Sequence, residues 1–192
     1  MNTDCIYKFL RENLPEKRLK HIEGVKKTAV YLAEKYGEDS QKAELAALFH
    51  DMYRKLSDED IDLYIKKFNL DEHRYKNNTN LIHSKVAAGN MEALYGIEDE
   101  DLINSVSFHT TGRAGMSNLE KIIFIADAIE PSREYPAVNI LRKLADEDLD
   151  CACLKILEST IRYLNKKGIE IDKDTLEARE YFKKITEIKN GK

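Results

Sequence analysis

The stretch AALFHDMYR, residues 46–54, decides the fold, because an apolar run ends there in a histidine and a carboxylate. The apolar side chains recur at helical spacing, at Leu45, Leu48, Phe49 and Met52. This periodicity predicts a buried helix that carries His50 and Asp51. Burying these two groups without partners would be costly. Neutral imidazole and carboxylate are both good metal ligands, so a metal ion beside the helix is the simplest partner.

A single His-Asp pair also fits a core histidine that is hydrogen-bonded to a carboxylate. The metal reading is favoured because other histidines and one acid lie in or just after apolar helical patterns. These residues are His21, His83, His109 and Asp127. His73, in contrast, lies in the polar segment 69–80 without an apolar flank, and we expect it to be solvated.

The composition predicts one all-α globular domain over residues 1–192. The chain is 42% hydrophobic and 34% charged, which is sufficient for one ordinary core. Only 3 prolines and 8 glycines interrupt it, and helix-favouring residues are abundant. The net charge of −4 argues against a nucleic-acid partner that is bound through a general basic field.

The chain shows no targeting or membrane-spanning segment. Its first residues lack a basic segment followed by an apolar stretch, and no run approaches the roughly 18 apolar residues that span a bilayer. We therefore expect a cytoplasmic protein, with no membrane partner and with reduced thiols at its 3 cysteines.

Hydrophobic periodicity and caps predict the helices in chain order. The first ends near Asn13, and the others are expected over 16–36, from Ser40 through Asp51, and over 58–68, 81–96, 99–108, 119–129, 138–145, 149–164 and 175–188. Ser57 with Asp60, and Ser117 with Glu120, have the spacing of capping boxes. The segment 69–80 is expected to be a loop, and 169–172 a brief extended piece.

The candidate ligands fall on at least four predicted helices, so they converge only if these helices pack around a common centre. The fold expected from this is a helical bundle with a metal site at its centre. The six candidate metal ligands are His21, His50, Asp51, Asp127, His83 and His109. They exceed what one tetrahedral zinc needs, and they suffice for two ions, or for one ion and a substrate.

Such a site is suited to phosphate chemistry. A metal ion lowers the pKa of a coordinated water and stabilises charge on a phosphoryl oxygen. Arg18 and Arg133 are planar forks that can hold non-reacting phosphates. The turn 109–116, with two threonines and two glycines, can bind an anion, although most such turns are only connections. The residues together indicate hydrolysis of a phosphoester or a phosphoanhydride.

Five segments in order resemble one known family, the YqeK family of symmetrical bis(5′-nucleosyl)-tetraphosphatases in the HD superfamily of metal-dependent phosphohydrolases. They are RLKH at 18–21, HD at 50–51, His83, HTTGR at 109–113 followed by Met116, and IADAIEPSR at 125–133. The bare pattern His21, His50-Asp51 and Asp127 is moderately specific for the superfamily. The segments 109–113 and 125–133 together are highly specific for the family.

The resemblance implies an all-α HD-domain bundle in which iron is the cofactor. By this resemblance, the first iron would be held by His21, His50, Asp51 and Asp127. His83 and His109 would line a second metal position or meet the phosphate chain, and we count them with Asp51 as catalytic candidates. Manganese or cobalt in place of iron, and one ion or two, stay open.

The implied reaction cleaves diadenosine tetraphosphate into two ADP, through attack of a metal-bound hydroxide on phosphorus. Arg18, Thr110 and Arg133, together with His83 and His109, would contact the nucleotide. A basic residue after the doublet would face the phosphates, and the sequence leaves open whether this is Arg54 or Lys55.

Two alternative functions would use the same site, one with catalysis and one without. Another HD hydrolase would act on mononucleotides and release nucleoside and phosphate. A non-catalytic sensor would bind metal and nucleotide without turnover. The expected partner is a dinucleoside polyphosphate or an ADP- or GDP-like nucleotide. A homodimer and the base preference stay open.

Overall fold

The computed structural model describes residues 3–189 and 191, and every regular element in this part of the chain is an α-helix. The all-α prediction is confirmed. The helices are α1 (Asp4–Asn13), α2 (Glu16–Tyr36), α3 (Ser40–Phe49), α4 (Asp58–Lys67), α5 (Glu72–Tyr75), α6 (Thr79–Tyr95), α7 (Glu100–Ser107), α8 (Asn118–Ile129), α9 (Val138–Glu147), α10 (Leu149–Lys167) and α11 (Lys173–Lys189).

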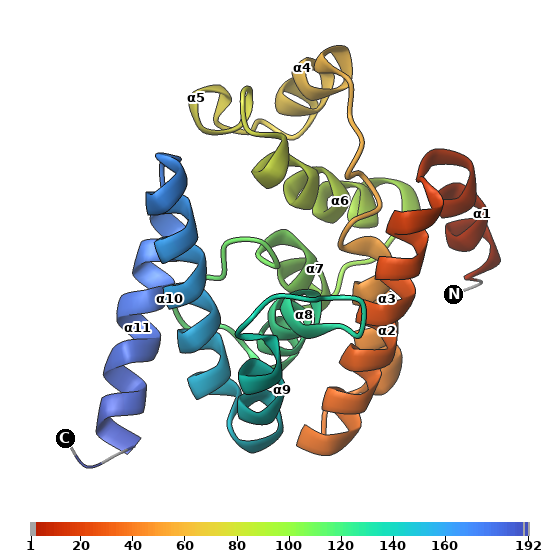
Figure 1. Ribbon diagram of the computed structural model, residues 1–192. Coiled ribbons are helices and arrows are strands. Elements are labelled where there is room, and N and C mark those ends of the chain that lie inside the picture. The colour runs from red at the N-terminus through yellow and green to blue at the C-terminus, as the bar shows by residue number, and fades with distance from the viewer. Residues whose placement is uncertain (1–2, 190, 192) are drawn as a thin grey trace.

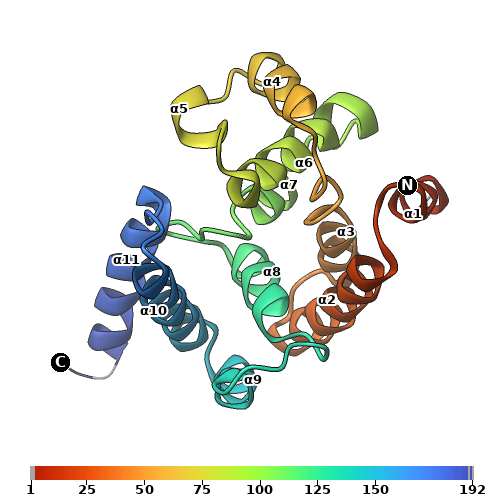
Figure 2. The same cartoon turned by 45° about the horizontal axis from the view of Figure 1, so that its top comes forward.

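Helix α8 lies at the centre of the bundle, between α2 and α3 on one side and α10 on the other (Figures 1 and 2). Its buried residues occupy the whole circumference, as expected of a helix that is enclosed on all sides. They are Leu119, Glu120, Ile122, Ile123, Phe124, Ile125, Ala126 and Ile129. Helix α3, which leads into His50, is buried in the same way at Ala43, Ala46, Ala47, Leu48 and Phe49.

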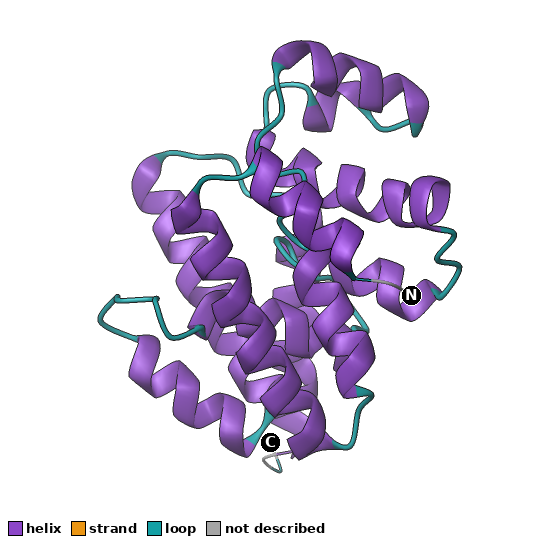
Figure 3. Ribbon diagram, turned by 90° about the vertical axis from the view of Figure 1, so that its right-hand side faces the viewer, coloured by secondary structure: helices purple, strands orange, loops and turns teal. Residues whose placement is uncertain are grey.

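Helices α4 and α5 project from one end of the bundle (Figure 3). The side chain of Arg74 on α5 ties this projection to the start of α11. Its guanidinium lies 2.6 Å from Asp172 and 2.5 Å from Asp174. These ion pairs join segments that are about 100 residues apart in the chain, and Asp172 also lines a cavity of about 560 Å³.

Local signals placed most helix ends correctly. Helix α2 has the predicted bounds, and Gly37 ends it with φ 73°, a conformation that glycine adopts without strain. Both capping boxes, at Ser57 and Ser117, are formed. Helix α3 begins after Asp39 rather than Ser40, because the Asp39 carboxylate accepts the free backbone N–H groups.

Three expectations were wrong in detail. Helix α3 ends at Phe49, so His50 caps the helix and Asp51 lies in the turn that follows it. The segment 69–80 contains α5, and α6 begins inside it at Thr79. The segment 169–172 forms no strand in the described structure.

No helix among the described residues is both long enough and apolar enough to cross a membrane.

Candidate metal centre

Three of the candidate histidines use one ring nitrogen in the same way. In each ring, Nδ1 lies within hydrogen-bond distance of a backbone carbonyl oxygen three or four residues earlier. The pairs are His50 with Ala47 at 2.6 Å, His109 with Val106 at 2.7 Å and His83 with Thr79 at 3.2 Å. Because a carbonyl only accepts, Nδ1 must carry the proton of the neutral ring. The lone pair is therefore on Nε2.

His21 reaches the same state through a carboxylate. Its Nδ1 lies 3.0 Å from Oε1 of Glu130, which is itself buried with 1% of its surface exposed. Metal-binding histidines commonly donate their second nitrogen to a carboxylate in this way, which fixes the tautomer and the ring orientation.

The four Nε2 atoms face one another in pairs. The Nε2 atoms of His21 and His50 are 3.3 Å apart, and those of His83 and His109 are 3.2 Å apart. With Nδ1 protonated in every ring, neither pair has a proton to share. A cation between the rings resolves this arrangement, because each lone pair then has a partner.

Asp51 lies between the two histidine pairs and faces both. Its Oδ1 is 3.1 Å from Nε2 of His83, and its Oδ2 is 3.4 Å from Nε2 of His50. Asp127 approaches from α8, with Oδ1 3.0 Å from Nε2 of His21. The ligand atoms of His21, His50 and Asp51 lie within 4.8 Å of one another, as do those of Asp51, His83 and His109.

Burial and charge set the protonation of these groups. Burial lowers the pKa of His109 to about 3, and the nearness of His50 and His83 adds to this effect. Burial opposes ionisation of Asp51, but the contacts of its carboxylate with His50 and His83 outweigh this and hold the pKa of Asp51 well below its ordinary value. The pKa of Asp127 is also lowered, since its contact with His21 and the charge of Arg133 outweigh the effect of burial. Both acids are carboxylates at neutral pH.

The donor set fits a divalent metal. Imidazole nitrogens and carboxylate oxygens, without a cysteine, are the ligands that iron, manganese, cobalt and zinc accept. The structure brings all six predicted ligands into one cluster, with Asp51 placed where it can bridge two positions. The cluster is nearly enclosed, since the five ligands other than Asp127 are each at most 6% exposed.

Two arginines cover the carboxylates of the cluster. Arg18 Nη1 is 2.5 Å from Oδ2 of Asp51. Arg133 Nη2 is 2.6 Å from Oδ1 of Asp127, and its Nε donates to the Asp127 carbonyl at 2.8 Å. Both arginine side chains are about one-third exposed, so each lies partly in solvent beside the candidate ligands.

Four of the six candidate ligands line a cavity of about 560 Å³, here called the main pocket. Four predicted nucleotide-binding residues, Arg18, Arg54, Thr110 and Arg133, line it together with Asp51, His83, His109 and Asp127. The Thr110 hydroxyl is buried without a hydrogen-bond partner, as expected of a group that meets a ligand. Lys55 is exposed and does not line this pocket, whereas Arg54 does.

Two sets of residues around the site were not anticipated from the sequence. The first is Glu130, whose signal was available: like Asp127, it is an acid at the end of a strongly apolar helix. Gly24 on α2 makes room for it, because a Cβ there would overlap the Glu130 carboxylate. The second set forms the outer wall of the main pocket and includes Thr160, Tyr163 and Thr175. No local pattern marks these residues.

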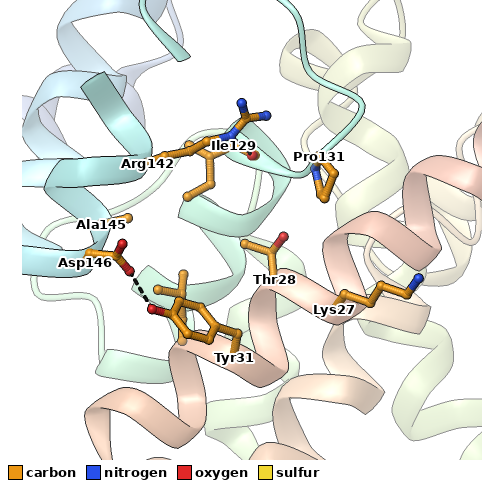
Figure 4. A pocket seen from close by; sticks show the side chains of 9 residues that line it. Lys27, Thr28, Tyr31, Ile129, Pro131, Arg142, Ala145 and Asp146 are labelled. Carbon is orange, nitrogen blue, oxygen red and sulfur yellow. Dashed lines mark hydrogen bonds between the residues drawn. The ribbon is translucent and has the colours of Figure 1, made fainter. Parts of the chain in front are cut away.

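The loop between α8 and α9 is held in place by Arg142 of α9. Its guanidinium donates to the carbonyl oxygens of Ile129 and Glu130 at 3.0 Å each, and to that of Arg133 at 3.2 Å. Figure 4 shows Arg142 beside Ile129 at the rim of a separate cavity of about 300 Å³ between α2 and α9. None of the candidate ligands lines this separate cavity. The contacts of Arg142 therefore fix the backbone that carries Glu130 and Arg133.

Comparison with known proteins shows the family. The HD domain family model matches residues 18–132. The chain is 42% identical over 189 residues to a symmetrical bis(5′-nucleosyl)-tetraphosphatase of Halalkalibacterium halodurans, covering 92% of this chain and 94% of the relative. It is 38% identical over 175 residues to a protein of the same name from Bacillus subtilis, covering 91% and 94%.

A crystal structure from Clostridium acetobutylicum is similar over nearly the whole length. It is described as a predicted HD superfamily hydrolase involved in NAD metabolism. The TM-score is 0.90 at 44% sequence identity, covering 95% of this chain and 97% of that one. Motifs, fold and relatives agree, and the chain belongs to the HD-domain family, in its group of YqeK-type symmetrical bis(5′-nucleosyl)-tetraphosphatases.

Proposed function

We propose that this protein hydrolyses diadenosine tetraphosphate and related dinucleoside polyphosphates symmetrically, to two nucleoside diphosphates. One observation carries the proposal: four imidazoles and two carboxylates form one cluster, and four of these groups, Asp51, His83, His109 and Asp127, line a pocket together with Arg18 and Arg133. The relatives named as symmetrical bis(5′-nucleosyl)-tetraphosphatases support the choice of substrate.

The proposed cofactor is iron, with manganese or cobalt as alternatives, because imidazole and carboxylate suit all three. His21, His50, Asp51 and Asp127 would hold the first ion. His83 and His109, with Asp51 as the shared ligand, would hold a second ion or bind phosphate oxygens. When bound, the metal lowers the pKa of a water molecule and neutralises charge on the phosphoryl group.

The chain's own residues bind and orient the substrate. Arg18 and Arg133 each present donors to the phosphate chain, and their positive charges offset the charge that develops on the departing diphosphate. Thr110 donates its unpartnered hydroxyl to a phosphate or ribose oxygen. Arg54 adds a third cation to the lining of the main pocket, with Nε 3.7 Å from Oδ1 of Asp51, so we assign it the role that the sequence left open between Arg54 and Lys55.

We also infer that residues 1–192 act as one domain, since a single core cluster includes side chains from Ile6 on α1 to Phe182 on α11. The net charge of −4 supports a nucleotide partner rather than a nucleic acid. A cytoplasmic location, a homodimer and the absence of a membrane partner stay predictions; the three cysteines form no disulfide in the described part of the chain, which supports a reducing compartment.

Product analysis tests the proposal. The protein is purified under reducing conditions, supplied with ferrous or cobaltous ion and diadenosine tetraphosphate, and the nucleotides are separated. ADP as the sole product is the expected result. ATP with AMP would mean attack at another phosphorus. Turnover of nucleoside monophosphates alone, to nucleoside and phosphate, would favour the mononucleotide alternative. Binding without turnover of either substrate would favour the sensor.

A further inference from the structure

A second cavity, here called the side pocket, adjoins the metal centre from the α2 side. Its volume is about 540 Å³, close to that of the main pocket. It is lined by His21, Glu130, Arg18 and Arg133 at its inner end, and by Lys17 and Tyr135 among the residues at its outer end. No role was assigned to this cavity by the sequence motifs.

The two pockets meet at the metal centre. Arg18 and Arg133 line both of them. The metal ligands divide between them, with Asp51 and Asp127 in the main pocket and His21 in the side pocket. A ligand that lies across the centre would therefore extend into both cavities and pass between the two arginines.

From this arrangement we infer that the side pocket binds the second nucleoside diphosphate half of the substrate, while the main pocket binds the first. The inference rests on the proposed function. Symmetrical cleavage places the reacting phosphorus in the middle of the molecule, so an equal half must extend on each side of the metal. Each cavity has the size of a site for one small ligand.

The charges of the side pocket indicate how the nucleoside diphosphate half of the substrate is oriented in it. The inner end carries the guanidinium groups of Arg18 and Arg133, which suit phosphates. The Glu130 carboxylate at the inner end is already engaged by His21 and Ser132. The outer end carries the exposed carboxylate of Glu134, which disfavours phosphates and can accept hydrogen bonds from ribose hydroxyls or an exocyclic amine. Lys17 is exposed at the rim, where it can meet the phosphate nearer the ribose.

Tyr135 supplies the surface for the base. Its ring is 37% exposed, and its hydroxyl donates to the carbonyl oxygen of Ala128 at 2.8 Å, which holds the ring in place. The loop that carries Tyr135 runs from α8 toward α2 (Figure 1), and Arg142 fixes its backbone at Arg133. A fixed, exposed aromatic ring is a stacking platform for a nucleobase.

The test measures binding of an analogue of diadenosine tetraphosphate whose central bridging oxygen is replaced by a methylene group. Titration calorimetry is performed on the cobalt-loaded full chain. Tyr135→Ala is expected to weaken binding about tenfold, as for loss of a base–aromatic contact. Tyr135→Phe keeps the ring and is expected to stay within about threefold of the wild type. Tyr181→Ala removes a ring of similar exposure, 39%, on α11 and is the matched control.

Equal affinity of the wild type and Tyr135→Ala, with cobalt content unchanged in both, would overturn the side-pocket assignment. This outcome is independent of the proposed function, which fails only if the wild-type protein releases no ADP from diadenosine tetraphosphate. Weaker binding in Tyr135→Ala and Tyr181→Ala alike would also contradict the assignment, because the loss would then not be specific to the side pocket.

Discussion

The metal centre and the outer wall of the main pocket are built in opposite ways. The centre is nearly dry, with His50 fully buried and Asp51 only 3% exposed, and each charge has partners inside the fold. The outer wall includes side chains that are largely exposed to solvent, with Tyr163 58% exposed and Ile169 48% exposed. Helices α2, α3 and α8 hold the centre through packing, whereas the ion pairs of Arg74 tie the wall to α5.

This difference separates two requirements of the reaction. Metal ligands must keep their geometry without substrate, so they are set among packed apolar side chains where few rotamers are available. The wall must admit and release a large anion, so it is made from segments with less apolar burial, which open at lower free energy. Substitutions should therefore act on metal binding at the centre and on substrate binding at the wall.

The largest effect is expected at the ligands. His50→Ala and Asp127→Ala each remove one donor from the group around the first proposed metal position. Metal content, measured by elemental analysis, should fall to background. The rate constant kcat/KM should fall by on the order of a thousandfold or more, because the Lewis acid is lost. His73→Ala, at an exposed histidine, is the control. Retention of both metal and turnover in the two ligand variants would contradict the metal assignment.

A smaller effect, still confined to the centre, is expected at Glu130. Glu130→Gln keeps the shape but removes the charge that His21 Nδ1 meets. The dissociation constant for Co²⁺, measured by competitive titration, should rise about 10- to 100-fold. Glu147→Gln, at an exposed position on α9, should leave it unchanged. If Glu130→Gln binds Co²⁺ as tightly as the wild type, the carboxylate does not support His21, and its role is limited to its hydrogen bonds with Ser132 in the loop.

The smallest effect on chemistry is expected at the wall. Arg74→Met leaves Asp172 and Asp174 without their partner, which should lower the free energy of unfolding at pH 7 by about 2 kcal/mol. KM should rise a few-fold while the Co²⁺ dissociation constant stays unchanged. Chemical denaturation and steady-state kinetics measure the two effects, with Arg11→Met on α1 as the exposed control. A change in metal affinity would show that wall and centre are not independent.

The stability effect at Arg74 should depend on pH. Burial raises the pKa of Asp172, but the hydrogen bond from Arg74 outweighs this and lowers it below its ordinary value of 3.8. A lowered pKa in the folded state adds stability that is fully present above 3.8 and is lost as the pH falls through the folded value. The difference between wild type and Arg74→Met should therefore be complete at pH 7 and shrink below pH 3.8.

Much of the fold was predictable because its signals are local. Apolar periodicity, together with Pro15 and Gly37 at the two ends, predicted both end residues of α2 correctly. Two capping boxes marked the starts of α4 and α8. Helix α5 was missed because its four residues are too few to show a period. The end of α3 was misplaced because the turn at Asp51 has neither glycine nor proline to mark it.

The all-α class and the six candidate ligands follow from the sequence alone, because periodicity and charges within apolar segments are properties of short stretches of chain. How these residues face one another depends on the packing of the helices. Glu130 meets His21 across 109 residues of chain, and the main pocket takes Arg54 rather than Lys55. Such contacts depend on how helices cross and where their side chains point, and those quantities are set by packing between distant segments rather than by any local pattern.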